Sequence, residues 1–139
     1  MTNLIPVVTN GDLAAILRVV VGFAFILHGL PKIKGGWRQS GQWIQSMGVP
    51  AGAAVLATIL EFFGGILLVV GFIVPVVAGL LAIQMASIVA MKKSKMHGSF
   101  VSMDPKRPSY EIDVLYLLLA VALVVLGAGV LSVDSFLGI

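Results

Sequence analysis

The sequence contains no cysteine among its 139 residues. Disulfides, thiolate metal sites, iron–sulfur clusters and CxxC redox chemistry are therefore excluded. Charged residues are also scarce, at 11% of the chain, well below the about 25% of an ordinary soluble domain. Whatever the protein does, its own thiols do not do it, and it has too few charges for the surface of a typical soluble protein.

What the chain has instead is apolar residues, at 59% with a mean hydropathy of +1.09. Four apolar runs, at 13–30, 51–72, 75–91 and 111–130, are each about long enough to cross a bilayer core as a helix. The third run is the shortest and is expected to extend towards Lys95 or to lie in a thinned membrane. No basic segment precedes the first run and no small-residue cleavage site follows it, which favours a retained helix over a signal peptide. We predict an all-α, integral membrane four-helix bundle of one domain, residues 1–139, in the cell membrane as a multi-pass protein.

Basic residues indicate how the bundle is oriented. With four spans, the first and third connections lie on the same side of the membrane. Eight of the nine basic residues fall in those two connections or at their edges: Lys32, Lys34, Arg38, Lys92, Lys93, Lys95, Lys106 and Arg107. By the positive-inside rule these connections are expected in the cytoplasm, and both termini on the extracytoplasmic side.

The connections also differ in character. Residues 34–50 contain Trp37 and Trp43, which suit a segment lying at the membrane interface. Residues 96–109 contain His-Gly, Asp-Pro and Arg-Pro pairs and are predicted to form an irregular loop. The turn at 73–75 is so short that the helices on either side must be antiparallel neighbours.

Polar residues inside the spans are placed by depth, using about 1.5 Å of rise per residue and the midpoint of each run as the membrane centre. Glu61 and Gln84 then lie close to the centre, and Arg18 about 5 Å to the outer side. Because an unpaired charge in lipid is expensive, we expect Arg18 and Glu61 to face the interior and to pair. The alternative is a purely structural clamp that fixes helix register.

A second polar layer is predicted about 10 to 14 Å to the inner side, formed by His28, Asp113 and Glu111. A carboxylate on the last helix could hold one nitrogen of His28, which would make a proton relay near the membrane surface. Glu111 and Asp113 lie some 200° apart on a helix, so only one can point inward with ease, and the other would meet headgroups or Lys32. Alternatively, His28 is only an interfacial anchor.

Small residues mark the expected helix contacts. Gly22 and Gly29 share a face with Arg18, and Gly64 and Gly65 share one with Glu61. In the third run, small side chains recur every fourth residue at Ala78, Ala82, Ala86 and Ala90, with Gln84 on another face beside Ser87 and Met91. These faces predict close packing but do not distinguish contacts within one bundle from self-association.

Taken together, these residues resemble the DoxX family over nearly the whole chain. The resemblance rests on R-x9-HG-x2-K from Arg18 to Lys32, on E-x2-GG from Glu61 and on an acid opening the last helix. It is most specific in the closing LGAGVLSVDSFL, where Gly127, Gly129, Ser132 and Asp134 match a GPG-x-x-S-x-D pattern. The chain departs from that pattern at Ala128, where proline is usual, and at residues 130–131, where Arg-Tyr is common.

The resemblance implies a four-helix membrane protein, often an oxidoreductase, with some relatives in quinone-linked complexes and others acting in assembly. The sequence has no recognisable haem, flavin or iron–sulfur motif, so a bound quinone or a partner subunit would carry the electrons. Our first hypothesis is therefore the membrane subunit of a quinone-linked oxidoreductase system. In it, the catalytic residues are His28 and Glu111, and the binding residues are Lys32, Arg18, Glu61, Gln84 and Asp113.

Two other functions stay open on the sequence. A non-enzymatic assembly factor, or a module that binds a small molecule or lipid, needs only the clamp, the small-residue faces and the basic loops. Transport would draw on the same buried charges, but four short helices would have to oligomerise to form a path. The expected partners are the lipid bilayer and either further copies of the chain or an oxidoreductase subunit, and no nucleic acid.

Overall fold

The computed structural model describes residues 9–139, and its regular structure is helical apart from one isolated backbone bridge between Ser99 and Ser109. The elements are α1 (Asn10–Pro31), a π-helical turn η1 (Lys32–Gly36), α2 (Trp37–Gln45), α3 (Gly52–Val70), α4 (Val74–Ser94), α5 (Glu111–Leu126) and α6 (Val133–Leu137). The predicted all-α class is confirmed.

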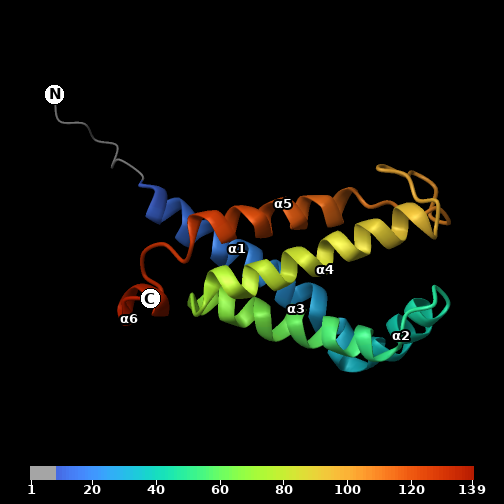
Figure 1. The fold of residues 1–139 in the computed structure, drawn as a ribbon, viewed down its shortest axis with the longest axis horizontal. Coiled ribbons are helices and arrows are strands. Elements are labelled where there is room, and N and C mark those ends of the chain that lie inside the picture. The colour runs from blue at the N-terminus through green and yellow to red at the C-terminus, as the bar shows by residue number, and fades with distance from the viewer. Residues whose placement is uncertain (1–8) are drawn as a thin grey trace.

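Four long helices form the bundle. Helix α1 packs along α3 and α4 along α5, while α3 against α4 and α1 against α5 complete the ring. In Figure 1 the start of α1, the α3–α4 turn and α6 lie at one end, and α2 and the connection between α4 and α5 lie at the other. The first and third connections therefore share one end of the bundle, as predicted, and with them the eight basic residues.

Three of the described helices, those beginning at Asn10, Gly52 and Val74, are long and apolar enough to cross a membrane. Helix α4 extends to Ser94, so the short third run does continue towards Lys95. Helix α5 has only 16 residues, about 24 Å at the usual rise. It ends at Leu126 because the chain turns at Gly127 with a φ of 73°. The predicted end of this span at residue 130 is thus wrong by four residues.

The crossing of α1 and α3 is built on glycine. A Cβ atom added to Gly22 would lie 2.7 Å from the carbonyl oxygen of Gly65, and one added to Gly65 would lie 2.7 Å from the oxygen of Gly22. Farther along, a Cβ at Gly29 would lie 2.9 Å from the backbone nitrogen of Phe62. Backbone approach this close needs residues without a side chain. The predicted glycine faces therefore do meet, and they fix the register of α1 against α3.

Only half of the alanines that recur every fourth residue along α4 pack inside the bundle. Ala78 and Ala82 are buried in the bundle core, whereas Ala86 and Ala90 are exposed. The core they join includes Phe25, Leu81 and Leu123. The outer faces of the long helices carry large apolar side chains, as expected for helices in contact with lipid.

The first connection is a folded element. Gly35, with a φ of 124°, lies inside the π-helical turn and kinks the chain between α1 and α2. Ile44 is buried, while polar residues of α2 stay exposed, so the helix is amphipathic, and it lies against the N-terminal end of α3. That residues 34–50 lie at the membrane interface stays a prediction. Residues 95–110, by contrast, form the irregular loop that was predicted.

Candidate functional site

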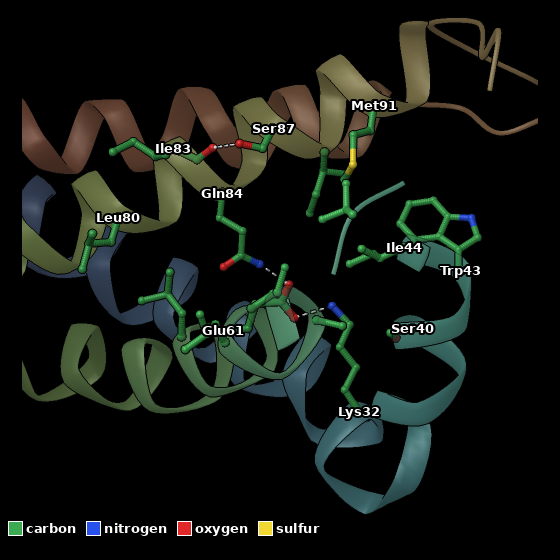
Figure 2. A pocket seen from close by; sticks show the side chains of 17 residues that line it. Lys32, Ser40, Trp43, Ile44, Glu61, Leu80, Ile83, Gln84, Ser87 and Met91 are labelled. Carbon is green, nitrogen blue, oxygen red and sulfur yellow. Dashed lines mark hydrogen bonds and ion pairs between the residues drawn. The ribbon is translucent and has the colours of Figure 1, made fainter. Parts of the chain in front are cut away.

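The centre of the candidate site is Glu61, whose side chain is completely buried on α3. Lys32 donates a hydrogen bond from Nζ to Oε2 of Glu61 at 2.5 Å. Gln84 on α4 donates from Nε2 to the other carboxylate oxygen, Oε1, at 2.6 Å. Figure 2 shows the three side chains converging from three elements. Both oxygens of a buried carboxylate are thus held, one by a cation and one by an amide.

The expected pair of Arg18 and Glu61 does not form. Arg18 is 3% exposed, and its guanidinium donates to backbone carbonyls. Its acceptors lie at the end of α3 and in the segment after α5: Leu68 (3.2 Å), Val69, Ala128 (2.8 Å), Val130 (3.4 Å) and Leu131 (2.5 Å). The prediction was wrong because α3 ends near Arg18 and the segment after α5 passes beside it. Backbone carbonyls at and beyond the end of a helix lack donor partners within it.

Lys32 reaches Glu61 because of the helix register. Gly29 lies against the backbone of Phe62, so Lys32, about one turn after Gly29, comes within reach of Glu61, the residue before Phe62. The lysine stem then extends along α3, and its side chain remains 23% exposed. Depth estimated from the midpoint of each run missed this contact, because it placed Lys32 at the membrane surface rather than beside α3.

A cavity of about 530 Å³ borders this polar group. It lies between α2, α3 and α4, and most of its lining is apolar. From α2 come Trp43 and Ile44, and Lys32, Glu61 and Gln84 supply charged and amide groups. The volume lies in the usual range for small-molecule sites, about 300–1,000 Å³. The predicted face of Gln84 with Ser87 and Met91 does line this cavity.

One atom of Gln84, a residue that lines the cavity, has no partner. Among the described residues, the only buried side-chain nitrogen or oxygen without a hydrogen bond is Oε1 of Gln84. In Figure 2 this oxygen points away from Glu61, on the side of Leu80, because the amide nitrogen is turned to the carboxylate. A buried, unpaired acceptor is costly and calls for a physical reason.

The predicted inner pair is arranged differently from expectation. His28 is exposed at the end of α1, where its ring contacts Tyr116 edge-on with 5.9 Å between centroids. Glu111 is exposed in the first turn of α5. Within residues 9–139 no hydrogen bond or ion pair joins the two, and neither lines the cavity.

Asp113 is the acid of α5 that points inward, since it is buried where Glu111 is exposed. It accepts a hydrogen bond from Lys92 Nζ at 2.6 Å, and Lys92 also donates to the carbonyl of Ser109 at 3.2 Å. This second ion pair ties the end of α4 to the start of α5. It does not border the cavity between α2, α3 and α4.

Sequence reasoning gave no role to Asp134 beyond its place in the closing motif. Its buried carboxylate accepts hydrogen bonds from the backbone nitrogens of Ile73 (2.6 Å) and Val74 (3.0 Å), at the start of α4. Its own nitrogen donates to the carbonyl of Gly71 at 2.9 Å. Carboxylates suit the N-terminus of a helix, where backbone N–H groups lack partners. The Ser-x-Asp signal therefore marks a structural clamp on the α3–α4 turn.

The fold and the site together define a helical membrane protein with a buried acid–lysine–amide group beside an apolar cavity. The chain belongs to the DoxX family, whose model matches residues 13–93. It is 30% identical, over 87% of its length and 84% of the other chain, to a Bacillus subtilis (strain 168) protein named "Putative oxidoreductase CatD". No solved structure matches the chain.

Proposed function

We propose that this protein is the membrane subunit of a quinone-linked oxidoreductase system and that it binds a quinone in the cavity between α2, α3 and α4. The observation that carries the proposal is an apolar cavity of about 530 Å³ with a charged pair and an amide on its wall. Sites for small apolar molecules typically combine such a lining with a few polar groups that fix orientation. The name of the Bacillus subtilis relative, an oxidoreductase, supports the same class of function.

The polar group supplies what quinone chemistry needs from a protein. Reduction of a quinone to a quinol takes up two electrons and two protons. A partner oxidoreductase subunit would supply the electrons, because the sequence carries no recognisable electron-carrier motif of its own. Lys32 and Glu61 can hold and exchange protons at the cavity wall, and Lys32 is partly exposed towards the basic end of the bundle. This chain's residues would therefore bind the ring and handle its protons.

The cavity is placed for entry from lipid. Its lining includes Leu56, Leu80 and Ile83, which also expose much of their surface on the outside of the bundle. In a membrane that surface contacts acyl chains. An apolar ligand dissolved in the bilayer would then reach Glu61 sideways between α3 and α4, without crossing water.

We further propose that the basic end of the bundle lies in the cytoplasm of a cell membrane, which puts α6 on the outer side. The chain has no native cysteine, so single cysteines can report this directly. Ser102→Cys, in the loop after α4, is expected to react with an impermeant thiol reagent only after cell lysis, and Ser135→Cys in intact cells. The reverse pattern would overturn the orientation.

The binding proposal is tested by purifying the protein in mild detergent, extracting it with solvent and identifying bound quinone by mass spectrometry. Ala57→Phe, which fills the cavity, is expected to remove the quinone. Val55→Phe is the matched control, since Val55 lies on the same helix, is exposed and does not line the cavity. A wild-type protein without stoichiometric quinone, even after incubation with it, would contradict the proposal.

The same cavity would also serve a non-enzymatic module that binds a lipid or another small molecule. Stoichiometric lipid in the extract, lost in Ala57→Phe, would favour that function. The proton relay of His28 and Glu111 stays a separate prediction, since neither residue lines the cavity. A His28→Ala variant that keeps quinone-dependent turnover with its partner would remove His28 from the mechanism.

A further inference from the structure

The orientation of the Gln84 amide follows from the charge on Glu61. The ionised carboxylate can only accept hydrogen bonds, so it holds the NH₂ group of Gln84 at 2.6 Å and turns the amide oxygen away. The charged group in contact with Glu61 is Lys32, the first residue of η1, which donates to the second carboxylate oxygen. Rotating the amide would bring two acceptor oxygens together and lose a charge-assisted hydrogen bond.

A residue that lines the cavity is therefore left with a buried acceptor that needs a donor. Oε1 of Gln84 is the one buried side-chain acceptor without a partner in residues 9–139, and Gln84 lines the cavity. The carbonyl oxygen of a quinone cannot satisfy it, because both atoms are acceptors. The hydroxyl group of a quinol can donate to it.

We propose that the site discriminates between the two redox forms of its ligand and prefers the hydroxyl-bearing ring, with Gln84 as the residue that determines this specificity. Glu61 acts through Gln84 as a positioning residue. The inference rests on the proposed function, since it concerns the same cavity, and it adds which form of the ring is held. When the quinol binds, its hydroxyl group can satisfy the buried acceptor. When the quinone binds, the acceptor stays unpaired, and this cost weakens binding of the quinone.

Lys32 does not reverse this preference. Its ammonium donates to Glu61 and has further N–H groups, which either a carbonyl or a hydroxyl oxygen can accept. Lys32 therefore supports both forms, while Gln84 supports one. A membrane subunit with this site would bind the quinol, the product of the proposed reduction, more tightly than it binds the quinone.

The test is anaerobic calorimetric titration of the detergent-solubilised protein with duroquinone and with durohydroquinone. These rings are fully methylated, so the quinone cannot add to Lys32. We expect the wild type to bind durohydroquinone about tenfold more tightly than duroquinone, the factor that one hydrogen bond of about 1.4 kcal/mol gives. Gln84→Met, which keeps the size of the side chain, should bring the ratio of the two affinities close to one.

Two further variants separate specificity from structure. Ser87→Ala is the matched control, because Ser87 lines the same cavity from α4 but donates its hydroxyl hydrogen to the carbonyl of Ile83 on its own helix. It should keep the wild-type ratio. Glu61→Gln removes the charge that orients Gln84, so its amide can turn either way and the ratio should fall.

The possible failures are distinct. Equal affinity of the wild type for the two forms, or a ratio that Gln84→Met leaves unchanged, would overturn the inference and leave the proposed binding site standing. Absence of binding by either form would overturn the proposed function, and the inference with it. Thermal unfolding of each variant in the same detergent shows whether it is folded, and Glu61→Gln provides a second reading if Gln84→Met is not.

Discussion

Replacing Lys32 by methionine should destabilise the protein far more than removing any exposed lysine. The carboxylate of Glu61 is wholly buried and Lys32 Nζ lies 2.5 Å from it, so Lys32→Met leaves a buried carboxylate without its cation. Removing one partner of a buried ion pair costs about 3–5 kcal/mol. Because Gln84 still donates to the other oxygen, we expect the lower end of that range, about 3 kcal/mol.

The double variant decides whether the loss comes from the orphaned charge. In Lys32→Met/Glu61→Met both charges are gone and the space is filled by apolar side chains, a replacement that is often neutral or stabilising. What is then lost is the hydrogen bond from Gln84, about 1 kcal/mol. Glu61→Met alone should cost about 1–2 kcal/mol, since Lys32 is 23% exposed and can turn towards water. The expected coupling energy between the two positions is about 3–4 kcal/mol in magnitude.

The free energy of unfolding is measured in mixed detergent and dodecyl sulfate, followed by circular dichroism. Lys34→Met is the control, because Lys34 is exposed on the same turn, and it should change stability by no more than about 0.5 kcal/mol. The reasoning is refuted if Lys32→Met behaves like Lys34→Met, or if the double variant is as unstable as Lys32→Met alone.

Three further predictions concern the frame around the site. Gly22→Ala should lower the free energy of unfolding by about 1–3 kcal/mol, because its Cβ would lie 2.7 Å from the oxygen of Gly65. Gly79→Ala is the control in the same unfolding assay. Its Cβ would make only an ordinary contact at 3.9 Å, so it should not destabilise the protein. Arg18→Lys should speed amide hydrogen exchange across residues 127–137, because one ammonium group cannot reach all the carbonyls that the guanidinium joins. Unchanged exchange would show that contacts other than those of Arg18 hold this segment. Lys92→Met should destabilise by less than Lys32→Met, because the side chain of Asp113 keeps 11% of its surface exposed whereas that of Glu61 keeps none. An equal loss in the same unfolding assay would show that this difference in burial does not matter.

Much of the frame could be predicted from periodicity and composition. Apolar runs located the four long helices, and the depth of Glu61 and Gln84 placed them together, as their 2.6 Å hydrogen bond confirms. The glycines of α1 and α3 were rightly expected at the helix contact. These inferences succeed because they depend on a residue's position along one helix, which the sequence gives directly.

The partners of the charged residues could not be predicted in the same way. Arg18 binds backbone carbonyls, and a carbonyl acceptor leaves no mark in the sequence, because every residue has one. Lys32 meets Glu61 only because Gly29 sets the register of two helices. Depth along the membrane says nothing of register or of rotation about the helix axis, and both decide which side chains touch.

Two of the buried polar groups of this bundle, around Arg18 and around Glu61, consequently differ in what they can do. Arg18 donates to five backbone carbonyls, and because a carbonyl neither titrates nor changes rotamer, this group is fixed once the chain is folded. Glu61 is held instead by two side chains, and each can turn to another partner without unfolding a helix. The group around Glu61 borders the cavity between α2, α3 and α4, which Arg18 does not line, and one atom of that group, Oε1 of Gln84, still lacks a partner. A ligand can therefore change the contacts around Glu61 while the clamp around Arg18 keeps the bundle intact, and this is why binding is assigned to the former and stability to the latter.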